Sequence, residues 1–325
     1  GEWFISFPYS MIPLGCEKSW QLFVYYLILT TALLGIWYGR KKLFVCLLPV
    51  ALVIVTLRFH SGFEFTALSV GQGDCLYMRL PDGTTCLVDG GSTTEKQIGK
   101  YKVLPYLKYC GVAEVDYIFL THLDEDHISG IRELLEVYGT LEGMQIGTIL
   151  FPAIANPDEK YTEIWRLAEE KGVPVKTIGA ADRLKGQEYE LECLYPVKGM
   201  YSEDKNETSI VLQLTFQEFS MLLTGDIGFE GEKELIKNGM IKNVDVWKVS
   251  HHGSKYSGGE AFLKVIAPQL SLISVGRNTY GHPSRELTER LKSVGSQVET
   301  TLESGALMLE SDGDSFSISL QRGED

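Results

Sequence analysis

Residues 121–127 constrain this chain more than any other segment. Their sequence, Thr-His-Leu-Asp-Glu-Asp-His, places four side chains that can bind a metal within six residues. The segment directly follows an apolar run, residues 117–120, that is typical of a buried strand. A strand that ends in such a turn directs imidazoles and carboxylates from one sheet edge toward a common point, and this mixed donor set suits Mn²⁺ or Zn²⁺. A solvated acidic turn is the alternative, but two of the chain's six histidines lie here.

Length and composition limit the remaining possibilities. A chain of 325 residues is long for one core and suggests two units. The formal net charge of −13 argues against nonspecific coating of the whole surface by nucleic acid, but it leaves a local basic groove open. The six cysteines form no C-x-x-C pair, so neither a zinc knuckle nor a disulfide framework is expected. The chain begins with Gly1 rather than Met, which suggests a piece of a longer polypeptide.

Two apolar runs near the start of the chain predict a membrane segment. The first has the roughly 20 residues that a helix needs to cross a bilayer, whereas the second is shorter and contains Pro49. We predict membrane helices at about residues 20–38 and 43–59. The chain would then divide into a membrane segment, residues 1–59, and a further domain, residues 60–325. A core hairpin of a soluble domain is the alternative.

The charges between the two runs predict the side of the membrane on which the domain lies. Arg40, Lys41 and Lys42 form the short connection. Basic loops remain in the cytoplasm. If both runs span the cell membrane, everything after about residue 60 lies on the extracytoplasmic side.

Beyond residue 60, short apolar segments alternate with segments of helical periodicity. Strands are predicted at residues 63–68, 75–80, 84–88, 117–120, 146–151, 173–178, 210–216, 219–224, 244–249 and 270–275, and short strands close the chain. Helices are predicted at residues 103–110, 128–138, 160–171, 230–238, 258–266 and 284–294. This alternation fits a layered α/β or α+β domain.

Further candidate ligands lie at the ends of later predicted strands. They are Asn206, Asp226, the pair His251 and His252, and His282. Each alone is a weak signal, because Asp is common in turns, Asn in caps and His in loops. Five of the six histidines nevertheless lie at such positions, which predicts that they converge. The residues alone leave open which member of the His251–His252 pair binds a metal.

The order of these motifs resembles a known family. A His-x-Asp-x-Asp-His, an Asn, a Gly-Asp, a His-His-Gly-Ser and a Gly-His-Pro follow one another as in the metallo-β-lactamase fold. More narrowly, the chain resembles the extracytoplasmic domain of the ComEC family of competence DNA-uptake membrane proteins. Residues 70–74, 88–91 and 277–283 are similar to that family too. The resemblance covers about residues 62–320 and implies an αββα sandwich with a metal site at one end.

The resemblance also implies a ligand set. Asp126, His127 and His252 would hold one ion, His122 and Asp124 would hold another with help from Asn206, and Asp226 would bridge both. Two positions depart from the pattern of the wider fold, because Asp124 and Asn206 stand where histidines are usual. More oxygen and less nitrogen shifts the preference from Zn²⁺ toward Mn²⁺ or Mg²⁺, with one or two ions bound.

The implied activity is that of a metal-dependent phosphodiesterase or nuclease. It would hydrolyse DNA, in particular the strand that is not imported, by a metal-activated water. Asp126 would orient that water, His251 would donate to a phosphoryl oxygen if His252 is the ligand, and His282 would act as general acid. Arg277 and Asn278 are candidate phosphate contacts, and we interpret Lys255 as an ordinary exposed side chain.

The expected partners are DNA, the membrane, the upstream channel portion of the same polypeptide and other DNA-uptake components. Two alternatives stay open. One is a hydrolase of the same fold that acts on another extracellular ester, such as a phosphocholine or a lactone. The other is a catalytically degenerate module that guides DNA. The acidic balance of the chain means that DNA binding requires a basic strip beside the site.

Overall fold

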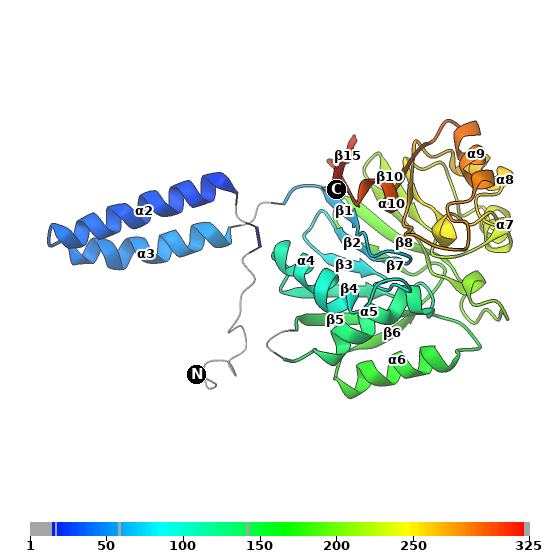
Figure 1. Ribbon diagram of the computed structural model, residues 1–325, viewed down its shortest axis with the longest axis horizontal. Helices are drawn as coiled ribbons and strands as arrows, with labels where there is room; N and C mark the ends of the chain where they lie inside the picture. Colours follow the sequence, from blue (N-terminus) through cyan, green and yellow to red (C-terminus); the bar gives the residue numbers. More distant parts are fainter. Residues whose placement is uncertain (1–14, 17, 58–59, 141–142, 322–325) are drawn as a thin grey trace. The chain divides into compact units, whose positions relative to one another are not determined.

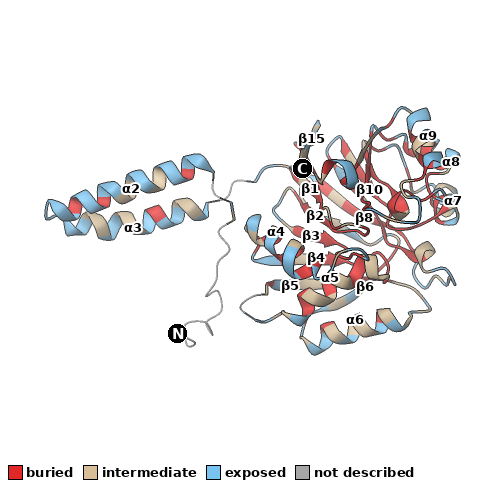
Figure 2. Cartoon of the chain, in the orientation of Figure 1, coloured by how far each residue is buried: buried red, intermediate tan, exposed pale blue. Residues whose placement is uncertain are grey.

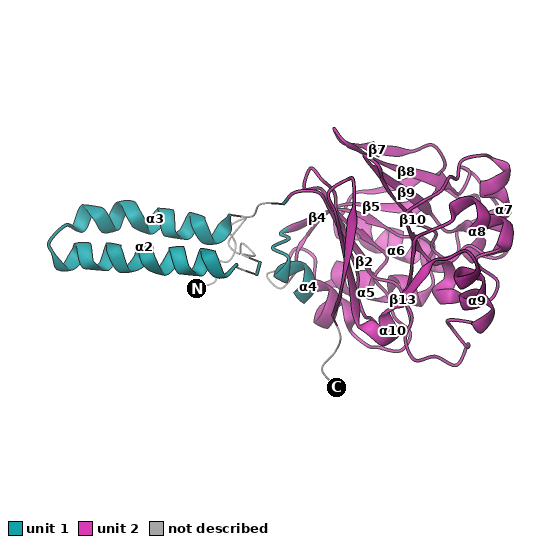
Figure 3. Cartoon of the chain, turned by 90° about the horizontal axis from the view of Figure 1, so that it is seen from above, with its two compact units in different colours: residues 1–60, 105–113 teal, residues 61–104, 114–325 magenta. Residues whose placement is uncertain are grey.

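The computed structural model describes residues 15–16, 18–57, 60–140 and 143–321. The chain forms two compact units (Figure 3), one of Gly1–His60 with Pro105–Ala113 and the other of Ser61–Leu104 with Glu114–Asp325. The predicted division between residues 59 and 60 stays a prediction. Each unit is described by itself.

Two helices dominate the first unit. Helix α2 (Ser19–Trp37) has a mean hydropathy of 1.5 over its most apolar window, and among the described residues it is the one helix long and apolar enough to cross a membrane. Helix α3 (Lys41–Thr56) has 16 residues and contains Pro49, so it is shorter than the span of roughly 20 residues that a bilayer requires. The predicted second helix extends to residue 59, but residues 58–59 lie outside the described part of the chain.

A buried glutamine joins α2 to α3. The side-chain amide of Gln21 donates hydrogen bonds to the carbonyls of Ile54 and Leu57, both at 2.8 Å. These carbonyls lie at the end of α3, where no further helical turn supplies donors. Small residues are buried between the helices: Ala32, Gly35 and Ala51. The two helices therefore form a hairpin. The remainder of α2 and α3 is largely exposed (Figure 2).

The second unit contains two sheets. The first has the order β15-β14-β1-β2-β3-β4-β5-β6. Its strands are antiparallel from β15 to β3 and parallel from β3 to β6. Their bounds are β1 (Phe63–Ala67), β2 (Leu76–Arg79), β3 (Thr85–Val88), β4 (Glu114–Phe119), β5 (Gln145–Pro152), β6 (Val175–Ile178), β14 (Ala306–Ser311) and β15 (Phe316–Gln321).

The second sheet has the order β13-β12-β11-β10-β9-β8-β7, and β10 to β13 are parallel. Its strands are β7 (Arg183–Lys185), β8 (Tyr189–Tyr195), β9 (Val211–Phe216), β10 (Phe219–Leu223), β11 (Val246–Lys248), β12 (Leu270–Ile273) and β13 (Gln297–Thr300). The sequence prediction missed β7 and β8. Strand β8 is rich in charged residues, but its apolar positions alternate and face inward.

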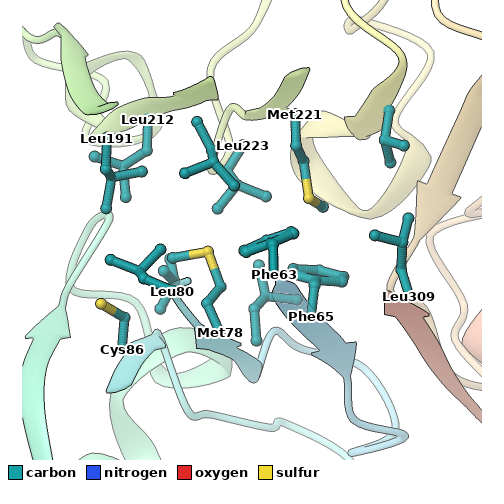
Figure 4. Packing of buried hydrophobic residues seen from close by; sticks show 14 of the residues in the cluster. Phe63, Phe65, Met78, Leu80, Cys86, Leu191, Leu212, Met221, Leu223 and Leu309 are labelled. Carbon is teal, nitrogen blue, oxygen red and sulfur yellow. The ribbon is translucent and has the colours of Figure 1, made fainter. Parts of the chain in front are cut away.

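The inner faces of the two sheets form the main hydrophobic core. Side chains of β1 and β2, such as Phe63 and Met78, point toward Leu212 and Met221 of the opposite sheet (Figure 4). The rings of Phe63 and Phe219 lie 5.8 Å apart, centroid to centroid. Burial of this apolar surface holds the sheets against each other.

Helices cover the outer face of each sheet (Figure 1). On the first sheet, Phe151 of β5 packs against Tyr161 and Trp165 of α6. On the second, a further apolar cluster joins α7, α8 and α9 to the strands beneath them. The helices of this unit are η1 (Gly99–Val103), α5 (Glu125–Glu136), α6 (Glu159–Glu170), η2 (Asn206–Thr208), α7 (Phe229–Lys237), η3 (Ser250–Gly253), α8 (Glu260–Ile266), α9 (Arg285–Ser293) and α10 (Thr301–Ser304), whereas α4 (Leu104–Tyr109) lies almost wholly in the first unit. The predicted αββα sandwich is confirmed.

Glycines bring three loops into contact at one end of the first sheet. A Cβ atom on Gly91, which follows β3, would overlap the backbone of Asp126 and His127 at the start of α5. One on Gly73, which precedes β2, would overlap the carbonyls of Gly91 and Asp126. Any side chain at these positions would force the loops apart. The close approach therefore positions the first turn of α5 beside the ends of the strands.

Candidate metal centre

Five candidate ligands from the sequence lie together where strands of both sheets end. His122 follows β4, and Asp126 and His127 lie in the first turn of α5. Asp226 follows β10, and His252 lies in η3, directly after β11. Segments separated by more than a hundred residues thus contribute to one site.

Part of the septet is helical rather than a turn. The helix predicted from residue 128 begins at Glu125, with Asp124 as the N-cap residue. The Asp124 side chain makes no capping hydrogen bond, but the carboxylates of Glu125 and Asp126 in the first turn interact favourably with the helix dipole. The helix therefore holds Asp126 and His127 on a rigid element.

The carboxylate of Asp226 lies among three imidazoles. Its Oδ2 atom is 3.4 Å from Nε2 of His127, 3.7 Å from Nε2 of His252 and 4.0 Å from Nε2 of His122. Nε2 of His252 is also 3.3 Å from Oδ2 of Asp126. The three histidines and Asp226 are buried, whereas the Asp126 side chain is 22% exposed.

Hydrogen bonds on the far side of two rings aim the Nε2 atoms inward. Nδ1 of His127 lies 2.8 Å from Oδ2 of Asp89, and Nδ1 of His252 lies 3.0 Å from the carbonyl of Ser274, so each Nδ1–H donates. Within the described chain, Nε2 of both histidines and Oδ1 of Asp226 are buried without a hydrogen-bond partner. Buried polar atoms that converge without hydrogen-bond partners are typical of a cation-binding site.

Electrostatic interactions within the cluster are strong. Burial would raise the pKa of Asp226, but the imidazoles of His127 and His252 hold it well below its ordinary value. Burial would lower the pKa of His127, but Asp226 and Asp89 hold it well above its ordinary value. Without a cation, protons thus compensate the buried carboxylates. Cation binding would release them.

The donor atoms fit a divalent cation. Two overlapping groups have ligand atoms within 4.8 Å of one another: His122, His127 and Asp226 form one, and Asp126, His127 and His252 form the other. Imidazole nitrogen combined with carboxylate oxygen suits Zn²⁺ and Mn²⁺. The fold and this donor set support divalent metal binding, whereas the identity of the metal and the role of each ligand stay predictions.

Asp124 lies at the edge of this cluster. Oδ2 of Asp124 is 3.8 Å from Nε2 of His122, but Oδ1 accepts a hydrogen bond of 2.9 Å from the ammonium group of Lys160 on α6. Asn206 lies in η2, and the backbone of this segment reaches the site where the N–H of Ile210 donates to the carbonyl of Thr121. The predicted ligand roles of Asp124 and Asn206 stay predictions.

The residues predicted to act on the substrate border the same site. His251 and His252 both adopt left-handed backbone conformations, with φ values of 51° and 50°. Such strain in successive non-glycine residues is typical of functional sites. The ring of His251 meets that of His282 edge-on at 5.6 Å. Burial and the neighbouring imidazoles lower the pKa of His282 to about 4, so this side chain is neutral at pH 7.

Asn278 and Arg277 lie on the loop that carries His282. Both ends of the Asn278 side chain shape this loop: Oδ1 accepts from the N–H groups of Tyr280 and His282, and Nδ2 donates to the carbonyls of Gly276 and His282. Arg277 is exposed. Contact of either residue with substrate stays a prediction.

The sequence prediction missed two side chains that hold the loop after His252. Glu232 of α7 accepts from the backbone N–H groups of Gly258 and Gly259. Arg290 of α9 donates to the carbonyls of Lys255, Ser257 and Gly258. No local pattern indicated them, because each contact joins residues at least 26 positions apart.

This fold and site define a class of protein. The model of the metallo-beta-lactamase superfamily matches residues 68–277. The chain belongs to this superfamily.

Particular relatives are competence proteins. The chain is 29% identical to ComE operon protein 3 of Bacillus subtilis over 81% of its own length and 35% of that protein. It is 29% identical to Recombination protein 2 of Haemophilus influenzae, over 75% and 28% of the two chains. It is 28% identical to competence protein ComA of Neisseria gonorrhoeae, over 74% and 31%. The chain thus spans about a third of the length of these relatives. The resemblance to competence proteins is confirmed.

Two solved structures are similar to the chain at low sequence identity. The metallo-beta-lactamase fold protein YhfI of Bacillus subtilis is 14% identical, with a TM-score of 0.48 over 75% of this chain and 98% of that one. The diiron beta-hydroxylase CmlA of Streptomyces venezuelae is 14% identical, with a TM-score of 0.48 over 83% and 59%.

The contact between Lys160 and Asp124 generates a prediction about the second ion. The Lys160→Met variant should bind that ion about two- to fivefold more tightly, because no ammonium then competes for Asp124 and exposed ion pairs are worth up to about 1 kcal/mol. Calorimetric titration with Mn²⁺ measures this change. Arg166→Met on the same helix is the control. A second ion that binds Lys160→Met more weakly, or with unchanged affinity, would contradict the prediction.

Glu232 generates a prediction about pH. Burial raises the pKa of Glu232 to about 7 from an ordinary value of 4.5. The folded state therefore holds a proton that the unfolded state releases, so stability is fully present below pH 4.5 and is lost as the pH rises through 7. The free energy of unfolding, measured with denaturant at several pH values, should decline by up to about 3 kcal/mol as the pH rises from 4.5 through 7. Glu232→Gln should make the free energy of unfolding depend less on pH, whereas the exposed Glu230→Gln should leave this dependence unchanged. Equal slopes in all three proteins would disprove it.

Proposed function

We propose that this chain is the metal-dependent phosphodiesterase domain of a membrane DNA-uptake protein and that it hydrolyses DNA. The observation that carries the proposal is the convergence of three imidazole Nε2 atoms, all within 4.0 Å, on one buried carboxylate oxygen of Asp226. The superfamily supports a metal-dependent hydrolase in general. The competence relatives support a role in DNA uptake.

A bound divalent cation would supply Lewis acidity, which lowers the pKa of water to about 7 and polarises phosphoryl oxygens. Asp126, His127 and His252 would hold one such cation, His122 and Asp124 would hold a second with help from Asn206, and Asp226 would contribute to both. Such a site needs no serine or cysteine nucleophile.

The side chains around this centre have distinct roles. The carboxylate of Asp126 is partly exposed, so it can also orient the attacking water. The ring N–H of His251 donates to a phosphoryl oxygen. Because His282 is neutral at pH 7, its geometry and pKa support a role as a second hydrogen-bond donor more than the role of general acid.

Basic side chains near the site support a phosphodiester substrate despite the net charge of −13. Arg277 lies on the loop of His282, and Lys160 contacts Asp124. DNA binding needs such local positive charge. The strand that is not imported is the substrate that fits an enzyme beside a DNA channel.

The proposal also places the domain outside the cell. Arg40 in the connection between α2 and α3, together with Lys41 and Lys42 at the start of α3, would remain in the cytoplasm. For this topology, α3 and its flanking residues must together cross the membrane a second time.

A nuclease assay tests the hydrolase. The metal-stripped chain in detergent, supplied with Mn²⁺, Mg²⁺ or Zn²⁺, should cleave double-stranded DNA or a single-stranded oligonucleotide. Asp226→Asn and Asp126→Asn should each reduce the rate by more than about 100-fold, because loss even of residues that only support ligands reduces activity 10–100-fold. Asp314→Asn, an exposed carboxylate, is the control.

The outcome separates the alternatives. Cleavage that survives both substitutions would come from a contaminant. Metal binding and DNA binding without cleavage would favour a DNA-guiding module. Cleavage of a small phosphodiester or lactone but not of DNA would favour a hydrolase of another extracellular ester.

A fusion experiment tests the topology. Alkaline phosphatase fused after residue 321 should be active, because the enzyme folds only outside the cytoplasm, whereas a fusion at Gly39 should be inactive. Deletion of α3 should make the fusion after residue 321 inactive. Activity at Gly39 and none at the carboxyl end would overturn the placement.

A further inference from the structure

A buried ion pair links the two sheets beside the candidate metal centre. Asp74 lies in the loop that leads into β2, and Lys248 is the last residue of β11 in the opposite sheet. The ammonium group of Lys248 donates to Oδ2 of Asp74 at 2.7 Å. Both side chains are at most 2% exposed. Buried charges are retained where they are paired, and removal of one partner is strongly destabilising.

Asp74 contacts candidate ligands that follow strands of both sheets. Its backbone N–H donates to the carbonyl of Asp126 at 3.0 Å. Its Oδ1 atom lies 3.7 Å from Nδ1 of His252, whose N–H donates to Ser274. In the described part of the chain, this Oδ1 is buried without a hydrogen-bond partner. The negative charge is therefore directed at the back of the His252 ring.

The arrangement parallels that of His127 and Asp89. In both cases a buried carboxylate stands on the Nδ1 side of an imidazole whose Nε2 points toward Asp226. A carboxylate behind a ligating histidine orients the ring and strengthens its nitrogen as a donor. Asp89 does so by direct hydrogen bond, and Asp74 by its charge.

The ion pair with Lys248 argues against a further metal site at this pair of carboxylates. Asp74, Asp89 and His127 have ligand atoms close enough to hold an ion. The Lys248 ammonium already neutralises Asp74, since it lies within direct hydrogen-bond distance of Oδ2. The chain thus supplies its own cation at this position.

We propose that Asp74 is a positioning residue for the metal centre, which supports His252 through its charge, and that Lys248 sets the strength of this support. The inference depends on the metal centre of the proposed function but not on the ester that is hydrolysed. The two partners therefore have opposite effects on cation binding. Loss of the carboxylate leaves a positive charge beside the site, whereas loss of the ammonium leaves a negative one.

Metal titration of the full chain in detergent tests this opposition. With Mn²⁺ as the probe, Asp74→Asn should raise the dissociation constant about 10- to 100-fold. Lys248→Met should leave the dissociation constant unchanged or lower it. The metal-free Lys248→Met variant should nevertheless unfold at a lower denaturant concentration. The double variant Asp74→Asn/Lys248→Met should recover stability and bind Mn²⁺ with intermediate affinity. The absorption spectrum of bound Co²⁺ reports whether the ligand geometry changes.

Matched controls separate positioning from folding. Asp116→Asn removes a carboxylate that accepts from Thr85 at the other end of β4, and Lys102→Met removes an ammonium that donates to the carbonyl of Ser69. Neither should change the affinity for Mn²⁺. If Lys248→Met weakens binding as much as Asp74→Asn does, and the double variant restores both, the pair is only structural and the proposal is overturned. Because the readout is binding, the result holds even if no nuclease activity exists.

Discussion

A buried carboxylate among imidazoles is the constraint on which the rest of this structure depends. Asp226 is 3% exposed, and a charge so far from water is costly unless opposite charge or hydrogen bonds compensate it. The compensating groups, His122, His127 and His252, come from both sheets. The site therefore exists only while the sheets are packed together. The apolar core between them maintains the geometry of the metal centre as well as the stability of the fold.

Close packing of the loops is the second condition. Gly73 and Gly91 allow the segments before β2 and after β3 to touch the first turn of α5, where Asp126 and His127 lie. Through these contacts the first sheet places its ligands on a helix rather than on a free loop. Rigid placement of this kind reduces the reorganisation that cation binding requires. Asp74, at the end of the same loop, extends the packing to Lys248 in the second sheet.

Much of the fold could be predicted because its signals are local. The hairpin of β2 and β3 follows from the Asp82-Gly83 turn pair between two strand segments, and the parallel strands follow from apolar runs. The prediction missed β8, although its Tyr-Glu-Leu-Glu-Cys segment alternates apolar and charged residues as a half-buried strand does, and it placed the start of α5 too late, because a metal-binding turn and a helix N-terminus share the same residues. The second membrane helix was also expected to be longer than α3 is.

By itself, the sequence determined which side chains are able to bind a cation and that they follow strands, because strand periodicity and residue chemistry are properties of short segments. Only the tertiary structure decided which nitrogen of each imidazole faces Asp226 and that Lys160 contacts Asp124. It also brought together Asp74 and Lys248, which are 174 residues apart. Side-chain orientation depends on hydrogen-bond partners and charges that come from distant segments, and no local pattern specifies them.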